Sequence, residues 1–146
     1  DAYKSIERLN NKLNEVNKEN RRLEEIISNY EVKEMIESAE KINNMNVIVK
    51  VYENKTMNYI NKIANKISER DDMVALFALT NNDKLNLLFA CSKNLEQLDM
   101  NNLLKDSIKL VDGKGGGSKV LAQGGGKNNG NLDSLFDYVK MKLKSN

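Results

Sequence analysis

Two clusters of glycine occupy residues 113–127, which read Gly113-Lys114-Gly115-Gly116-Gly117-Ser118-Lys119-Val120-Leu121-Ala122-Gln123-Gly124-Gly125-Gly126-Lys127 and contain seven of the chain's eight glycines. Glycine can adopt positive φ, and without a Cβ it lets another group come close to the main chain. Exposed N–H groups beside several lysines are typical of segments that bind phosphate or a nucleic-acid backbone. A flexible linker is the alternative, although linkers rarely place an apolar Val-Leu-Ala between glycine clusters.

The charge of the chain supports a local rather than a global attraction for polyanions. Net charge is only +2 over 146 residues. From residue 105 onward, however, eight lysines face four aspartates, and the excess lies beside the glycine clusters. A local basic patch of this kind can attract a polyanion even when the whole chain is nearly neutral. The phenylalanines, Phe77, Phe89 and Phe136, fall on expected core faces, which argues against recognition by base stacking.

Composition excludes several kinds of chemistry. The chain has no histidine, which removes histidine-based acid–base catalysis, Ser-His-Asp and Cys-His nucleophiles and histidine metal sites. A single cysteine excludes a cysteine-rich zinc site within one chain. We therefore expect no catalytic residues, no metal and no cofactor. Cys91 lies in an apolar run and is expected to be a reduced core thiol, consistent with the cytoplasm.

No apolar run approaches the length of a transmembrane helix, and no signal peptide is visible, so we expect no membrane partner. The chain begins with Asp1 rather than Met, which suggests a piece of a longer protein. Nucleotide-binding patterns also fail, because residues 115–119 match neither a Walker A loop nor a Rossmann loop, and both of those follow a strand directly. Asp71-Asp72 is expected to be a solvated turn rather than a catalytic pair.

The N-terminal segment carries an unbroken heptad repeat. One narrow apolar stripe of this kind would be marginal as an isolated helix and therefore calls for a partner helix. The partner is either a second copy of the chain or an upstream helix of the parent protein. The stripe is formed by Ile6, Leu9, Leu13, Val16, Asn20, Leu23, Ile27 and Tyr30. Asn20 at an a position would fix the register.

The heptad ends after Tyr30, but apolar spacing predicts that the helix continues to about Asn43. Residues 1–44 are thus a predicted helical stalk, and residues 45–146 a globular domain. In the second part, the pattern predicts strands near 47–52, 73–79 and 85–92 and helices near 57–67, 99–111 and 132–144. Thr56, Asp99 and Asn131 are the expected N-caps. The fold class is α/β (α+β), with a small mixed sheet flanked by helices; the first two strands would be parallel and the next two a hairpin.

The glycine segment resembles the signature of the DHH-associated domain, in the form found at the C-terminus of alanyl-tRNA synthetases and of long AlaX-type editing proteins. The resemblance covers nearly the whole chain and rests on Gly113–Gly117 followed by Ala122-Gln123-Gly124-Gly125-Gly126. It implies a module that binds the elbow of alanine tRNA and takes part in dimerisation. Two tRNA-facing Gly-rich loops would be formed by Lys114, Gly115, Gly116, Gly117 and Ser118, and by Gln123, Gly124, Gly125, Gly126 and Lys127.

One departure from the family is the pair Ser118-Lys119, which stands where these synthetases commonly carry Arg-Pro; Lys119 would then supply the charge. The editing site of the family uses His and Cys ligands, and its phosphoesterase relatives use Asp-His-His, so neither site can lie in this chain. We therefore expect a non-catalytic tRNA-binding and oligomerisation module. The alternatives are a nucleic-acid-binding domain of a DHH phosphoesterase and a purely structural dimerisation domain.

Overall fold

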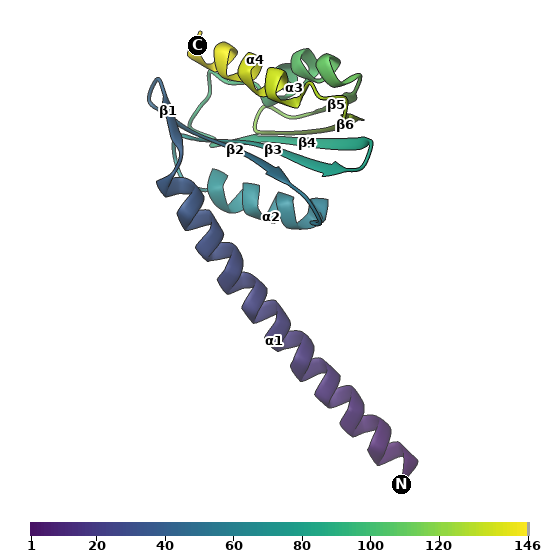
Figure 1. Ribbon diagram of the computed structural model, residues 1–146. Coiled ribbons are helices and arrows are strands. Elements are labelled where there is room, and N and C mark those ends of the chain that lie inside the picture. The colour runs from purple at the N-terminus through teal and green to yellow at the C-terminus, as the bar shows by residue number, and fades with distance from the viewer. Residues whose placement is uncertain (146) are drawn as a thin grey trace. The chain divides into compact units, whose positions relative to one another are not determined.

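The computed structural model describes residues 1–145 and divides into two compact units, residues 1–34 and 35–145 of the described chain. Four α-helices, one 3-10 helix and six strands follow one another along these residues (Figure 1). Their order and bounds are α1 (Ala2–Glu37), β1 (Glu40–Ile42), β2 (Met45–Tyr52), α2 (Met57–Ser68), β3 (Met73–Asn81), β4 (Lys84–Cys91), α3 (Met100–Ser107), η1 (Ile108–Val111), β5 (Lys114–Gly117), β6 (Leu121–Lys127) and α4 (Leu132–Lys144).

The first unit is the regular part of α1, and its heptad stripe faces solvent. The apolar side chains of the stripe, from Ile6 to Tyr30, are all exposed, with exposed fractions from 43% at Leu23 to 68% at Leu9. Asn20 is exposed as well. A helix of 36 residues with such a stripe leaves a continuous apolar surface without cover in the single chain.

The expectation that this helix reaches Asn43 is wrong. The helix ends at Glu37, and residues 40–42 form β1, which pairs antiparallel with β2. Asn43 makes the tight reversal possible because it adopts a left-handed conformation, with φ of 50°. Its side-chain amide also donates to the carbonyl oxygens of Leu143 and Lys144, at 3.3 and 3.1 Å. The reversal thus also caps the last turn of α4, a long-range contact that helical periodicity does not reveal.

The sheet is mixed, as the sequence predicts. Its strand order is β1-β2-β3-β4-β6-β5. The β2 and β3 strands are parallel and joined through α2, and β3 and β4 form an antiparallel hairpin, so both predicted connections are confirmed. Three strands were not predicted from the sequence: β1, and the pair β5 and β6 formed by the glycine segment.

Helices cover both faces of the sheet, with α2 on one face and α3, η1 and α4 on the other (Figure 1). The predicted N-cap Thr56 is confirmed, since its hydroxyl accepts from the Tyr59 N–H at 3.2 Å. Asp99 caps α3 in the same way, through the Asn102 N–H at 3.1 Å. Asn131 occupies the N-cap position of α4 but makes no side-chain capping hydrogen bond.

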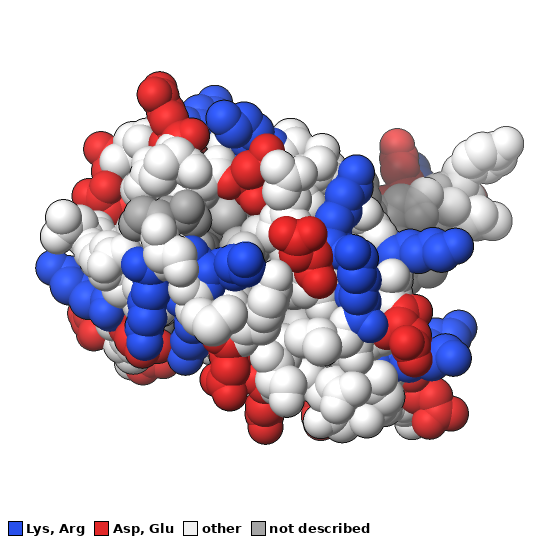
Figure 2. All heavy atoms as spheres, turned by 90° about the horizontal axis from the view of Figure 1, so that it is seen from above, with Lys and Arg blue, Asp and Glu red and all other residues white. Residues whose placement is uncertain are grey.

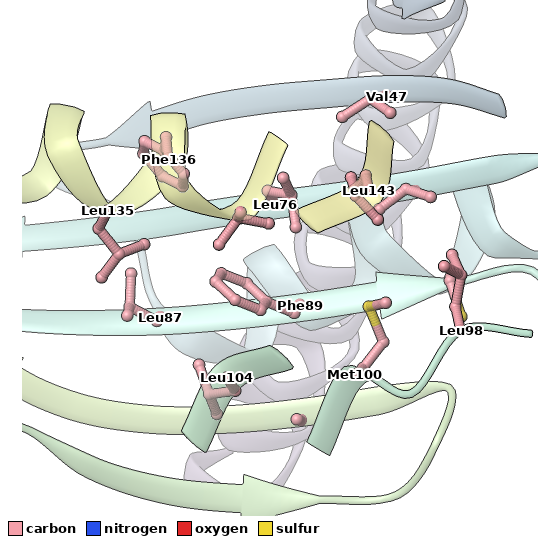
Figure 3. Close-up of a cluster of buried hydrophobic side chains, with 14 of the residues drawn as sticks. Val47, Leu76, Leu87, Phe89, Leu98, Met100, Leu104, Leu135, Phe136 and Leu143 are labelled. Atoms are coloured by element: carbon pink, nitrogen blue, oxygen red, sulfur yellow. The ribbon is translucent and has the colours of Figure 1, made fainter. Parts of the chain in front are cut away.

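The larger core lies between the sheet and the second helical layer. Side chains of β2, β3 and β4 meet those of α3 and α4 there (Figure 3). Phe89 and Phe136 belong to this core, while Phe77 packs edge-on against Tyr52, with ring centroids 5.5 Å apart. All three phenylalanines are buried, as expected. Cys91 is a free thiol in the same core, where burial raises its pKa to about 11, so it stays protonated at neutral pH.

Candidate nucleic-acid interface

The glycine clusters form two strands rather than the two loops expected from the sequence. The β5 and β6 strands pair antiparallel, and β6 also pairs with β4, so the segment is the last two strands of the sheet. None of the seven glycines in residues 113–126 has positive φ; the positive-φ glycine is Gly130, with φ of 85°. These glycines are therefore not explained by a need for positive φ. The other explanation offered by the sequence is that neighbouring groups come close to their main chain.

On the face covered by η1, glycine is required by packing. A Cβ on Gly124 would overlap the Cδ1 atom of Ile108 and lie 2.8 Å from the carbonyl oxygen of Lys114. A Cβ on Gly126 would lie 2.7 Å from the carbonyl oxygen of Val111. The 3-10 helix thus rests directly on the backbone of β6. The same crowding against main-chain atoms is found at Gly113, Gly115 and Gly117.

Ser118 and Lys119 form the turn between the two strands, and internal hydrogen bonds hold this turn in place. The Ser118 hydroxyl accepts from the Leu121 N–H at 3.2 Å, and the Ser118 N–H donates to the Leu121 carbonyl at 2.8 Å. The first N–H groups of α3, at Met100 and Asn101, donate to the carbonyls of Lys119 and Ser118, at 2.9 and 3.1 Å. The Lys119 ammonium donates to the carbonyl of Glu96 at 3.4 Å. Each member of this turn therefore already has a structural role.

The opposite face of β6 is open. Burial alternates along the strand, with Gln123, Gly125 and Lys127 exposed and the two glycines between them half-buried. A Cβ on Gly125 would come no closer than 3.4 Å to another atom, the Oδ1 of Asn86, which is ordinary van der Waals contact. Packing therefore does not require glycine at position 125, in contrast to its neighbours at 124 and 126.

Three lysines lie close to Gly125 in the register of the sheet. Lys114 is its partner on β5, and Lys127 follows it by two residues on β6. Lys84 begins β4 and is the direct partner of Lys127. All three are exposed, and among the residues that the structure describes none of them forms an ion pair with a carboxylate. On the side of the domain covered by α3 and α4, charges of both signs are interspersed (Figure 2).

A groove lies at the other end of the same face. It has a volume of about 630 Å³, and its floor includes Ala90, Val120 and Leu121. Its rim carries the carboxylates of Glu69 and Asp71 as well as the ammonium of Lys93. The two ends of the β6 face thus differ in charge, and a polyanion would be favoured at the lysine end.

Only part of this arrangement could be predicted from the sequence. Gln123, Gly125 and Lys127 lie on the open face, and Lys114 is the register partner of Gly125 on β5, whereas Lys119 lies in the turn. Lys84 and Asn86 were missed, because their position beside Lys127 and Gly125 depends on the pairing of β4 with β6. Within residues 1–145, no group of histidine, cysteine or carboxylate side chains could hold a metal ion, and no helix is long and apolar enough to cross a membrane.

The chain belongs to the DHHA1 domain family, whose model matches residues 44–145. Among curated proteins it is similar to an alanine–tRNA ligase of Methylacidiphilum infernorum, with 36% identity over 103 residues. That match covers 70% of this chain and 11% of the ligase, so the chain spans about a tenth of the length of this relative.

Solved structures that share the fold include the following two. The C-Ala domain of alanyl-tRNA synthetase from Aquifex aeolicus superimposes with a TM-score of 0.69 at 23% identity, covering 73% of this chain and 98% of that domain. RecJ from Thermus thermophilus, in complex with Mn²⁺, superimposes with a TM-score of 0.60 at 13% identity, covering 84% of this chain and 17% of RecJ. At these identities the likeness concerns the fold.

Proposed function

We propose that this chain is a non-catalytic tRNA-binding module of an alanine–tRNA ligase or of an AlaX-type alanyl-tRNA editing protein in the cytoplasm. The single observation that carries the proposal is the set of three lysines around Gly125, which have no ion pair within the described residues, in a domain similar to part of alanine–tRNA ligases. Lysines that lack carboxylate partners can neutralise phosphates, and the accompanying release of counterions drives binding.

The module would act by positioning the tRNA. It holds the elbow of alanine tRNA, so that another domain of the parent protein can act on the acceptor end. Tethering the RNA in this way raises the effective concentration of the acceptor end at the catalytic domain. The glycine strands and lysines on residues 114–127 are the proposed contact region, and no residue of this chain takes part in bond making.

The exposed heptad of α1 adds a second part to the proposal, namely pairing with another helix. The stripe from Ile6 to Ile27 is apolar and exposed, and such a surface is stabilised when a partner helix covers it. The partner is a second copy or an upstream helix of the parent. Replacing the polar Asn20 with leucine should strengthen self-association, which sedimentation equilibrium measures; a monomer in both forms would exclude pairing with a second copy.

Titration of the 146-residue chain against fluorescently labelled alanine tRNA, at several salt concentrations, tests tRNA binding. The logarithm of affinity should fall linearly with the logarithm of salt, with a slope of about −0.9 for each phosphate neutralised on a duplex. An RNA hairpin of the acceptor stem alone, which lacks the elbow, should bind more weakly. The proposal would be contradicted by undetectable binding at low salt or by an affinity independent of salt.

A further inference from the structure

Lys84 and Lys127 form a like-charged pair at the lysine end of the open face of β6. They are direct partners in the antiparallel register of β4 and β6, and both are exposed. Direct cross-strand partners on one face have Cβ atoms about 4.5–5.5 Å apart, and like charges at that separation destabilise a sheet. The main-chain carbonyl of the neighbouring Asp83 accepts from the Asn128 N–H at 2.9 Å. Among the described residues, the Asp83 carboxylate forms no ion pair with Lys84 or Lys127.

Gly125 lies next to this pair and leaves a gap in the row of side chains. Its strand neighbours are Asn86 on β4 and Lys114 on β5, both partners in register. The space above it is free, since an added Cβ would only touch Asn86 at 3.4 Å. A glycine inside a strand weakens the strand, and one that packing does not require often marks a place where a ligand approaches the backbone.

We propose that Lys84, Asn86, Gly125 and Lys127 form the subsite that contacts the sugar–phosphate backbone of the bound RNA. The inference rests on the proposed function and specifies where on the domain the RNA lies. Lys84 and Lys127 neutralise one or two neighbouring phosphates, and those phosphates relieve the repulsion between the two ammonium groups. The missing side chain at Gly125 lets the ribose chain lie against the sheet.

The neighbouring polar groups fit RNA better than an acidic peptide. Asn86 and the exposed Gln123 lie two register positions apart on this face and offer amide donors and acceptors. Such groups can bond a ribose 2′-hydroxyl or a phosphate oxygen. Toward the groove the rim carries two carboxylates, Glu69 and Asp71, against one ammonium, Lys93, so a phosphate chain is favoured at the lysine end.

The first experiment compares two double variants of the 146-residue chain. Lys84→Ala/Lys127→Ala should weaken binding of alanine tRNA at low salt about tenfold or more and reduce the magnitude of the salt slope by about 2, one for each phosphate-contacting lysine. Lys105→Ala/Lys109→Ala removes the same charge from α3 and η1, where both lysines are exposed, and should leave the slope within about 0.5 of the unsubstituted chain. Equal effects of the two double variants would overturn the assignment.

A second variant separates a ligand role from a structural role. Lys127→Glu replaces a repulsive pair with an attractive one, so the melting temperature of the free chain should rise at low salt and the gain should shrink at high salt. The same variant should bind alanine tRNA more weakly than Lys127→Ala does. If Lys127 had a structural role, Lys127→Glu would instead lower the melting temperature. A tRNA affinity of Lys127→Glu equal to that of the unsubstituted chain would contradict the proposal.

The outcomes distinguish this inference from the proposed function. If the unsubstituted chain binds no alanine tRNA, the proposed function and this subsite both fail. If it binds but the Lys84/Lys127 variant behaves like the Lys105/Lys109 variant, the function stands and the subsite fails. Poly-glutamate of matched charge should not displace the tRNA; displacement as effective as that by unlabelled tRNA would point to an acidic protein as the partner and overturn the choice of RNA.

Discussion

The two faces of β6 carry glycine for different reasons. On the face toward η1, Gly124 and Gly126 leave room for Ile108 and Val111, so the packing of η1 on β6 requires residues without a side chain. On the open face, Gly125 has free space above it and three lysines around it. Neighbouring glycines of one cluster are therefore needed for different reasons: some for packing and, in our proposal, Gly125 for the approach of a ligand. The sequence motif alone does not distinguish these two roles.

The largest expected difference between these faces is in stability. Gly124→Val should lower the free energy of unfolding by about 3 kcal/mol or abolish folding, because its side chain must displace both Ile108 and main-chain atoms. Gly125→Val should leave it unchanged or raise it by up to about 1 kcal/mol, because valine favours strands and no atom crowds this position. Urea denaturation followed by circular dichroism measures both. Similar losses of unfolding free energy in the two variants would mean that the two faces of β6 do not differ in their need for glycine.

A double-mutant cycle sharpens the explanation for the covered face. Gly124→Ala should be less destabilising in an Ile108→Ala background, with a coupling energy of about 1 kcal/mol, because shortening Ile108 removes one of the two clashes. The relief should be partial, since the carbonyl oxygen of Lys114 would still lie 2.8 Å from the new Cβ. Strict additivity in denaturation experiments would mean that Ile108 does not restrict this position.

A smaller effect is expected at the outer strand β5. The side-chain oxygen of Asn101 accepts from the Gly117 N–H at 2.9 Å and would lie 2.9 Å from a Cβ on Gly116. Asn101→Ala should cost about 1 kcal/mol and speed hydrogen exchange at the Gly117 amide. Unchanged exchange at that amide would show that the hydrogen bond does not protect β5.

The smallest effect is expected at the opposite edge of the sheet, in β1. Glu40 pairs with the Lys140 ammonium at 2.8 Å, and this hydrogen bond, reinforced by charge attraction, lowers the pKa of the Glu40 carboxyl. A lowered pKa means that the stabilisation is complete above the ordinary glutamate pKa and is lost as pH falls through the folded-state value. Glu40 is half exposed, so the pair contributes at most about 0.5 kcal/mol.

Glu40→Gln is therefore a control for the comparison of the two faces. It should lower stability slightly at neutral pH and have no effect at a pH well below the ordinary glutamate pKa, which denaturation under the two conditions measures. Its affinity for alanine tRNA should equal that of the unsubstituted chain, because β1 and β6 are separated by three strands. A clear loss of binding would mean that the RNA reaches the β1 edge.

Most of the architecture could be predicted because it depends on local patterns. Apolar spacing located α2 and α4, and a run of β-branched residues located β2. The strands that were missed depend on distant partners. Glycines have low strand propensity, so β5 and β6 are strands only because β4 offers an edge for pairing and η1 packs on their backbone. Likewise β1 depends on its pairing with β2, and the turn between them contacts α4 through Asn43, a hundred residues away in the sequence.

The candidate site could be predicted only in part, for the same reason. The glycine clusters and Lys114 and Lys127 are visible in the sequence, and the family resemblance gave them a target. The pairing of Lys84 with Lys127 is visible only in the sheet register. The family resemblance assigned Ser118 to the first tRNA-facing loop and offered Lys119 as a source of charge; the hydrogen bonds of the turn show that both also have structural roles.

The affinity of Gly125→Val for alanine tRNA, measured by fluorescence titration at low salt, tests the central claim most directly. The substitution keeps every charge and should keep the fold, but it places a branched side chain on the open face of β6. We expect a loss of affinity of about tenfold or more, with unchanged circular dichroism. An affinity equal to that of the unsubstituted chain would contradict the assignment of the open face of β6 as the RNA-binding surface.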